Sequence, residues 1–216
     1  MQPRIVTAAT CSLHFAGLAR PVAPDIAKVE RRPCPDQYIG QVCELERNRS
    51  ITVRLPAENR LGTPGLLVVL ESPHIAEFKT EPAPARGTTG LQIARYLREV
   101  VGSSIRDEHP ITLLNAVRYQ CSLGFSPGSF RDKVFTSVWL NGGREDFASR
   151  LQSLYHAGDI ILCSCTKGGS NETSKQLRQL VYAAIIESLP LAQVERCTHP
   201  ASWHSPRNRL HRWSAA

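Results

Sequence analysis

Residues 66–70, Leu-Leu-Val-Val-Leu, form an unbroken run of branched apolar side chains, and this run constrains the fold more than any other feature. A short continuous run of this kind is typical of a β-strand that is buried on both faces. Three further apolar runs follow it along the chain, at residues 111–117, 159–165 and 192–197. A strand buried on both faces needs a layer of helices above and below it, so the sequence predicts an α/β protein.

Segments with helical periodicity lie between these runs. After the first run, apolar side chains recur every three or four positions at Leu91, Ala94, Leu97 and Val101, which predicts a helix over residues 88–101. Helices are also expected over residues 130–140, 145–156 and 174–188. Strands that alternate with helices predict a three-layer α/β/α fold with a central, mainly parallel four-stranded sheet.

The chain before residue 64 has weaker patterns. Residues 1–35 contain five prolines and no steady period, and we expect them to form a loosely ordered N-terminal arm. Residues 38–45 and 50–55 alternate moderately between apolar and polar side chains, as in a hairpin of two short strands. We therefore expect one domain over residues 36–216, with its core at about residues 64–212.

Composition excludes several classes of protein. Hydrophobic residues make up 42% of the 216 positions, which is enough for a core and excludes wholesale disorder. No run of about 18 apolar residues occurs, so a membrane-spanning helix is not expected. No fixed-period repeat is present. The net charge of +7 favours a polyanionic partner without identifying it.

The seven cysteines do not form a recognisable framework. An odd number scattered over a chain of this length is a poor set for disulfides, and the spacings lack the repeated close pairs of a zinc site. Two of them, Cys163 and Cys165, fall inside an apolar run and are expected in the core. We expect a cytoplasmic protein that uses no metal and no cofactor.

Polar residues follow each predicted strand at its carboxyl end. In parallel sheets these ends meet at one edge, where chemistry gathers. Convergence at this edge is the strongest indication of a site that the residues give by themselves. The residues concerned are Glu71, Ser72 and His74 after the first strand, Asn115 and Arg118 after the second, Lys167 after the third and His199 after the fourth.

Four motifs at these positions resemble the uracil-DNA glycosylase superfamily. Residues 70–74, Leu-Glu-Ser-Pro-His, resemble its water-activating loop, which reads Gly-Gln-Asp-Pro-Tyr in one branch and Gly-Glu-Ala-Pro-Gly in another. Residues 113–117, Leu-Leu-Asn-Ala-Val, are similar to the strand end Leu-Leu-Asn-Thr-Val, whose Asn reads the uracil edge. Residues 199–207 are similar to the His-Pro-Ser-Pro-Leu-Ser loop, and residues 86–91 to the Gly-x-Ser/Ala-Gly helix start. The motifs occur in family order over residues 64–212.

The sequence departs from the family pattern in the same motifs. Leu70 replaces the opening Gly, Ser72 replaces the aspartate of one branch, and His74 replaces the Tyr or Gly of the pocket floor. Ala85 stands near the position of the aromatic residue that stacks on the base, and the cluster cysteines of one branch have no equivalent. Such departures are expected of a member with different specificity or weakened catalysis.

The resemblance implies a monofunctional, monomeric DNA glycosylase of DNA repair. Such an enzyme flips a damaged or modified base of the uracil type out of DNA and hydrolyses its N-glycosidic bond. By this resemblance, Glu71 supplies the negative charge that handles the water and Ser72 positions it. His199 then donates a hydrogen bond to the leaving base. Because Ser72 carries no charge, Glu71 is the expected carboxylate of the reaction.

The resemblance also implies contacts to the base and to DNA. Asn115 would hold the base edge, His74 would line the pocket, and Trp203 would act as the wedge. Phosphate contacts would come from Lys167, Ser170, Arg207, Arg209 and Arg212. The residues alone leave a structural role open for each of them, such as a strand-end amide bonded to a loop, an aromatic anchor or a solvated basic tail.

Two other functions fit the same residues. One is a catalytically weakened module of the same fold that binds DNA or nucleotides. The other is an α/β hydrolase with Ser72 as the nucleophile and His199 as its base. No Gly-x-Ser-x-Gly elbow surrounds Ser72, which disfavours this hydrolase.

Overall fold

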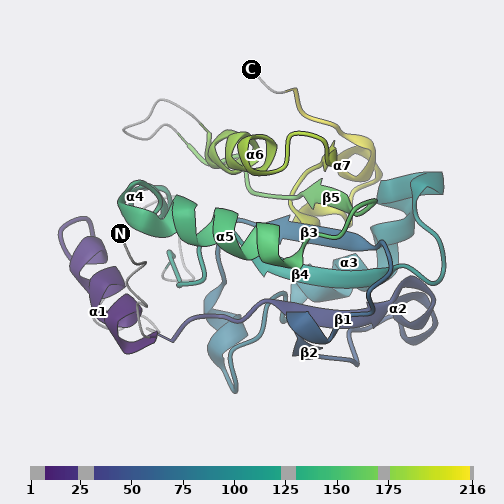
Figure 1. The fold of residues 1–216 in the computed structure, drawn as a ribbon, viewed down its shortest axis with the longest axis horizontal. Coiled ribbons are helices and arrows are strands. Elements are labelled where there is room, and N and C mark those ends of the chain that lie inside the picture. The colour runs from purple at the N-terminus through teal and green to yellow at the C-terminus, as the bar shows by residue number, and fades with distance from the viewer. Residues whose placement is uncertain (1–7, 24–31, 123–129, 170–175, 215–216) are drawn as a thin grey trace.

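The computed structural model describes residues 8–23, 32–122, 130–169 and 176–214, and side chains from residue 14 onward. One mixed sheet of six strands has the order β2-β1-β4-β3-β5-β6 (Figure 1). Its strands are β1 (Gln37–Gln41), β2 (Leu55–Pro56), β3 (Leu66–Leu70), β4 (Pro110–Asn115), β5 (Ile160–Cys163) and β6 (Gln193–Arg196).

The four strands expected from the apolar runs correspond to β3, β4, β5 and β6, which are neighbours in this larger sheet. β3 pairs in parallel with β4 and with β5, and β5 pairs in parallel with β6. The predicted number of strands is nevertheless wrong, because the sheet has six strands and not four. β1 pairs antiparallel with both β4 and β2, and so adds two strands beyond β4. The protein is therefore α/β with a mixed sheet.

Helices cover both faces of the sheet. The α-helices are α1 (Ala8–Ala19), α2 (Val42–Asn48), α3 (Thr88–Val101), α4 (Arg131–Val138), α5 (Arg144–Leu154), α6 (Leu177–Ser188) and α7 (Pro206–Leu210). Short helices are η2 (Ala57–Asn59), η3 (Ile75–Phe78), η4 (Gly102–Ser104), the π-helical η5 (Trp139–Gly143) and η6 (Pro200–Ser202). The helices predicted over residues 88–101, 130–140, 145–156 and 174–188 correspond to α3, α4, α5 and α6, with shifted ends for the last three.

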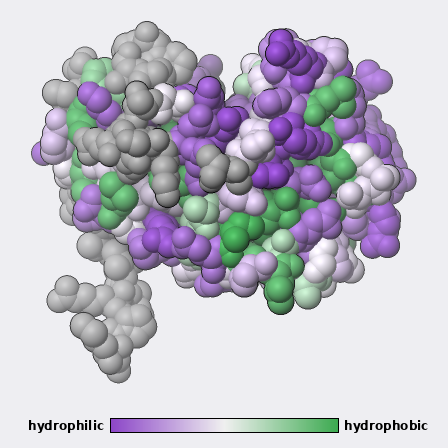
Figure 2. Space-filling view, turned by 90° about the horizontal axis from the view of Figure 1, so that it is seen from above, coloured by the Kyte–Doolittle hydropathy of each residue, from purple (hydrophilic) through white to green (hydrophobic). Residues whose placement is uncertain are grey.

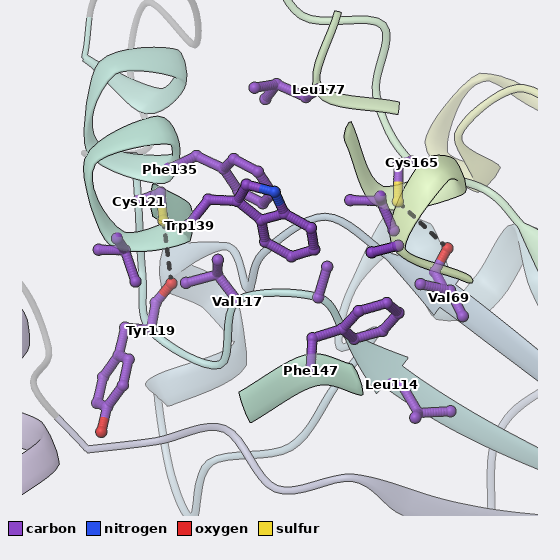
Figure 3. Close-up of a cluster of buried hydrophobic side chains, with 14 of the residues drawn as sticks. Val69, Leu114, Val117, Tyr119, Cys121, Phe135, Trp139, Phe147, Cys165 and Leu177 are labelled. Atoms are coloured by element: carbon purple, nitrogen blue, oxygen red, sulfur yellow. Dashed lines mark hydrogen bonds between the residues drawn. The ribbon is translucent and has the colours of Figure 1, made fainter. Parts of the chain in front are cut away.

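Alternate residues of β3 fill two separate cores. Leu67 and Val69 face α4, α5 and α6, where Phe135, Trp139 and Phe147 pack together (Figure 3). The other residues of β3, Leu66, Val68 and Leu70, pack with apolar residues of α2 and α3 on the opposite face. Every side chain of β3 is therefore buried, as the continuous apolar run predicts.

The hairpin predicted from residues 38–45 and 50–55 is correct in the antiparallel pairing of β1 with β2 but not in the extent of its strands. Residues 42–48 form α2 instead of continuing the first strand. Gln41 and Glu44 form a reciprocal capping box at the start of α2, and the carboxylate of Glu44 accepts the backbone N–H of Gln41 at 2.8 Å. Val42 and Leu45 then lie on one buried face of the helix. The pattern that resembled strand alternation is thus the i, i+3 spacing of a short helix.

The prediction of a loosely ordered arm over residues 1–35 differs from the structure at α1, which packs on the core, while residues 1–7 and 24–31 lie outside the described residues. Phe15 and Ala19 are buried, and the ring of Phe15 stacks on Tyr119 with centroids 4.6 Å apart. The Ser137 hydroxyl of α4 donates to the Leu18 carbonyl at 3.1 Å. The prolines that suggested irregular structure lie outside α1, and Pro21 lies just beyond its end.

A buried ion pair holds the amino ends of β3 and β5 together. The Asp159 carboxylate accepts hydrogen bonds at 2.7 Å from the Arg60 guanidinium and from the backbone N–H groups of Gly65 and His156. Both side chains of the ion pair are almost completely buried. The pair lies at the end of the parallel strands opposite to their carboxyl ends.

On the face drawn in Figure 2, hydrophobic side chains lie in groups among hydrophilic ones. Exposed large apolar residues are scattered over the chain at Leu55, Leu61, Ile75, Leu91, Leu140, Leu191 and Leu210. In the described part of the chain, no helix has both the length and the apolar character needed to cross a membrane.

Removing one charge of the buried pair should destabilise the fold. Asp159→Asn leaves the Arg60 guanidinium buried without a counter-charge, so the free energy of unfolding should fall by about 3–5 kcal/mol. Glu187→Gln is the matched control, because its pair with Arg144 is 57% and 48% exposed and should be worth less than about 1 kcal/mol. Urea unfolding measures both, and equal small losses would contradict the role assigned to Asp159.

Candidate functional site

A cavity of about 620 Å³ lies at the carboxyl ends of the parallel strands. It is bounded by the loops after β3, β5 and β6 and by the start of α3. Its volume falls within the range of about 300–1,000 Å³ that is usual for ligand sites. The strand-end polar residues that it brings together are Glu71, Ser72, His74, Thr166 and His199.

Glu71 is the first residue after β3 and is held rigidly. It is only 6% exposed. Its carboxylate accepts hydrogen bonds from both the backbone N–H, at 3.1 Å, and the hydroxyl of Thr166. Its backbone carbonyl accepts the Val117 N–H at 2.9 Å, which ties the end of β3 to the segment after β4. The carboxylate therefore has a fixed position in the wall of the cavity.

His199 lines the cavity next to Glu71. Its Nε2 lies 3.6 Å from the Oε2 of Glu71. Its Nδ1 accepts the backbone N–H of Ala201 at 3.2 Å, at the start of η6. Because Nδ1 is an acceptor, the proton of the neutral imidazole lies on Nε2, which faces the Glu71 carboxylate. The structure therefore brings together two of the predicted catalytic residues.

Ser72 and His74 line the same cavity but are differently engaged. Burial raises the pKa of the Cys121 thiol to about 12, and an interaction with the Ser72 side chain lowers this pKa by a smaller amount. Ser72 therefore lies beside the buried Cys121 thiol. His74 is exposed, and its Nδ1 accepts the Ala76 N–H at 3.1 Å to cap η3.

Asn115 does not reach the cavity, in contrast to the prediction. It is 1% exposed, and its Nδ2 donates to the Cys34 sulfur at 3.6 Å. Its Oδ1 has no partner among the described residues. Cys34 is itself fully buried and directs its thiol toward Glu77, 3.9 Å away. Residue 34, which was assigned to the arm, therefore covers the amide that was expected to read a base.

Trp203 is also placed differently from the prediction, because it is a core residue. It is 0% exposed and packs with the apolar side chains that lie between the sheet and α3. Its indole N–H donates to the Thr198 carbonyl at 2.9 Å. A side chain in this position cannot enter DNA as a wedge. It anchors the loop that carries His199, which is the structural role that the sequence left open.

Arg209 is occupied within the protein. Its guanidinium donates to the Glu99 carboxylate at 2.6 Å and to the Trp203 carbonyl at 2.7 Å. It also lies 4.2 Å from the centroid of the Tyr96 ring. These contacts join the C-terminal loop to α3, so the predicted phosphate contact by Arg209 is corrected to a structural one.

The remaining predicted DNA contacts fall into three groups. Arg212 donates to the backbone carbonyls of Arg209, at 3.0 Å, and of Val100, so it also secures the C-terminal segment. Lys167 and Arg207 are exposed, and they stay predictions. Ser170 lies outside the described residues.

Glu77 is a cavity residue that the sequence reasoning missed. It is 3% exposed and lies in η3, after the first strand-end motif. Burial raises the pKa of Glu77 to about 8 and the charge of Glu71 adds to the rise, whereas the backbone N–H groups of Ala85 and His74 and the charge of Arg54 lower it. Glu77 is therefore largely protonated at neutral pH, unlike an ordinary glutamate. In the sequence, the only indication of this role is an acidic residue between two apolar ones, Ala76 and Phe78.

Two arginines give the cavity a basic side. Arg86 lines it next to the start of α3, and its Nε is buried without a partner in the part of the chain that the structure describes. Arg131 lines it from α4 and donates to the Asp132 carboxylate at 2.8 Å. Sequence reasoning placed Arg86 in a motif without a role and did not single out Arg131.

The described residues contain no cluster of side chains suited to binding a metal ion. Within the described ranges, no group of three or more His, Cys, Asp or Glu side chains is arranged to hold a metal ion. The described cysteines are free thiols, and five of the six are buried. The cavity therefore offers carboxyl, imidazole, hydroxyl and guanidinium groups for its chemistry.

Known proteins give no further evidence about the site. Neither family models, nor curated proteins, nor solved structures match the chain. The function has to be argued from the cavity itself.

Truncating Trp203 should affect stability first. Trp203→Ala removes a fully buried indole, so the free energy of unfolding should fall by about 3–5 kcal/mol. His204→Ala, at the exposed neighbouring position, should change it by less than about 0.5 kcal/mol. Denaturant unfolding measures both, and a stable Trp203→Ala protein would show that the indole is not an anchor.

Glu77 should make stability depend on pH. Its pKa is raised from 4.5 to about 8 on folding, so between these values the folded protein binds a proton that the unfolded chain has released. Its contribution to stability is therefore complete below about pH 4.5 and decreases as pH rises toward 8, by at most about 1.4 kcal/mol per pH unit. Glu77→Gln should remove this component. Unfolding curves at several pH values test it, and parallel pH profiles of the two proteins would contradict it.

Proposed function

We propose that the protein hydrolyses the N-glycosidic bond of a damaged or modified base in DNA. The observation that carries this proposal is the pair formed by Glu71 and His199, which lie 3.6 Å apart in the cavity. By the family resemblance, Glu71 handles the water and His199 donates a hydrogen bond to the leaving base. The cavity lies where parallel sheets usually carry their chemistry.

The chemistry of the bond suits these two side chains. Breaking it develops positive charge on the sugar and negative charge on the leaving base. The Glu71 carboxylate, fixed by Thr166, stabilises the sugar cation and orients the attacking water. His199, which lines the cavity with Nε2 beside Glu71, donates its Nε2–H to the leaving base. Ser72 lines the cavity beside Glu71, and the family resemblance gives it the role of positioning the water.

DNA as the partner is supported by charge and by size. The chain carries a net charge of +7, and Lys167 and Arg207 are exposed cations. A base must leave the stack to be cleaved, and the cavity of about 620 Å³ can receive it. Trp203, Arg209 and Arg212 contribute nothing to this support, because they are engaged within the protein.

A second candidate function is a catalytically weakened module that binds DNA or nucleotides. The burial of Asn115 beneath Cys34 favours it, because the amide expected to hold the base edge is covered. Such a module would use the cavity for binding and would turn over slowly or not at all.

Base release from oligonucleotides tests both functions. DNA strands bearing uracil, hypoxanthine or modified pyrimidines are incubated with the protein, and abasic sites are detected by alkaline strand scission. Glu71→Gln should lower the rate by roughly 10²–10⁴-fold while DNA binding is retained, since a neutral amide cannot supply the charge. Glu58→Gln, an exposed glutamate of η2, is the matched control and should leave the rate unchanged.

Three results would change the assignment. If Ser72→Ala releases no base while Glu71→Gln has a nearly normal rate, Ser72 and not Glu71 is the essential residue. Binding without base release by the wild type would favour the binding module. If the wild type neither binds DNA nor releases a base from it, DNA is not the partner.

A further inference from the structure

A second cavity adjoins the one that holds Glu71 and His199. Its volume is about 580 Å³, and it lies along the start of α3 and the segments that precede this helix. The two cavities share three lining residues, Ala76, Arg86 and Gly87. We refer to the second one as the side cavity. It begins where the first cavity ends, at Arg86.

Positive charge lines the side cavity. Its cationic residues are Arg54, Lys79 and Arg86, and its described lining contains no Asp or Glu. Three cations without a lining carboxylate create a positive potential, which favours a ligand that carries negative charge. The side cavity therefore differs from the first cavity, where carboxyl groups and cations occur together.

We propose that the side cavity binds a phosphate group of the substrate and that Arg86 is the residue that recognises it. This proposal rests on the proposed function, because a nucleotide whose base enters the first cavity carries phosphate on its sugar. The charge of that phosphate then becomes part of substrate selection. The phosphate belongs either to a DNA strand or to a free nucleotide.

The guanidinium of Arg86 has a donor that needs an acceptor. Its Nε is buried, and among the described residues no acceptor lies within hydrogen-bonding distance of it. A buried donor without a partner costs free energy, and the cost is larger for a charged group. A phosphate presents several oxygen acceptors to the planar fork of a guanidinium. A phosphate in the side cavity therefore completes the hydrogen bonding of Arg86.

The segment before Arg86 is held in place by two side chains. The Arg54 guanidinium donates to the Pro84 carbonyl at 2.8 Å and to the Ala85 carbonyl at 3.5 Å. The carboxyl group of Glu77 accepts the backbone N–H of Ala85. Arg86 therefore follows a segment that has little freedom, so its own backbone position is fixed before a ligand enters.

The backbone turns sharply at Arg86. The residues on both sides of it have positive φ, +54° at Ala85 and +79° at Gly87. A Cβ on Gly90 would lie 2.0 Å from the Ala85 carbonyl oxygen, so α3 begins directly against this turn. The turn places Arg86 where its side chain lines both cavities.

The other two cations contribute in less specific ways. The Arg54 guanidinium is already engaged by the Gln37 side chain at 2.9 Å and by the Pro84 carbonyl at 2.8 Å, so it adds charge more than hydrogen bonds. Lys79 is exposed, and its attraction for a phosphate should weaken with salt. Recognition of the phosphate therefore depends mainly on Arg86.

The test uses oligonucleotides that carry one modified base and differ only in the linkage next to that nucleotide. The linkage is an ordinary phosphodiester or a neutral methylphosphonate, placed on the 5′ or the 3′ side. For the wild type, one of the two replacements should raise KM by roughly 10–100-fold, the usual effect of losing a hydrogen bond to a charged group. Arg86→Gln should raise KM by a similar factor on the ordinary strand and by little more on the methylphosphonate strand.

Two further variants complete the set. Arg95→Gln is the matched control, because it removes the same charge from an exposed residue of α3 that is not among the lining residues of either cavity. It should respond to the methylphosphonate as the wild type does. Arg86→Lys keeps the charge but not the planar fork, and its KM on the ordinary strand should be intermediate.

A separate arm identifies the source of the phosphate. The free deoxynucleoside 5′-monophosphate of the same base is compared with the oligonucleotide. A higher kcat/KM on the monophosphate assigns the side cavity to a free nucleotide, and a higher kcat/KM on the oligonucleotide assigns it to a DNA strand.

Equal increases in KM by Arg86→Gln on the phosphodiester and methylphosphonate strands, or no increase on either, would overturn the role of Arg86 and leave the proposed function intact. A readout independent of activity is the arginine ¹⁵N Nε–H signal during titration with inorganic phosphate. One signal should shift in the wild type and be missing from Arg86→Gln, and the absence of any shift would overturn the proposal. If this signal shifts but the wild type releases no base from any substrate, the proposed function fails and the phosphate site stands.

Discussion

Burial of β3 on both faces is the constraint on which the rest of the structure depends. A strand of five apolar residues in the centre of a sheet has to be covered twice, and its alternate side chains fill two different cores. The residues that follow this strand line the cavity, and because the strand is fixed in the core, the start of this loop has a fixed position. The carbonyls of Leu70 and Glu71 accept N–H groups from the segment after β4, which holds the start of the loop in place. The position of Glu71 is thus set by the packing of β3 together with these backbone hydrogen bonds.

Features that depend on burial and periodicity were predictable from the sequence. The four parallel strands and α3 follow from apolar runs and from a clear helical spacing. The placement of Glu71 and His199 at one cavity follows from the rule that parallel strands end at one edge. Both results need only local patterns and one topological rule.

The differences arise where contacts between distant segments decide the outcome. No local pattern could show that Cys34 would cover Asn115, because the two residues are 81 positions apart. Trp203 resembled an exposed wedge by its place in a motif, but its burial depends on α3 and the sheet. α2 was missed because a capping box at Gln41 competes with a weak alternating pattern. Glu77 carried no signal, since its role depends on a cavity that forms only in the folded chain.

The indole of Trp203 has a consequence for the loop that bears His199. Its N–H binds the carbonyl of Thr198, the residue before the histidine, while its ring is buried in the core. The loop therefore loses its conformational freedom when the protein folds and has little left to lose when a ligand enters. A ligand that binds beside His199 therefore spends little of its interaction energy on ordering this loop. The rigidity of this loop is thus a thermodynamic contribution of the core to binding.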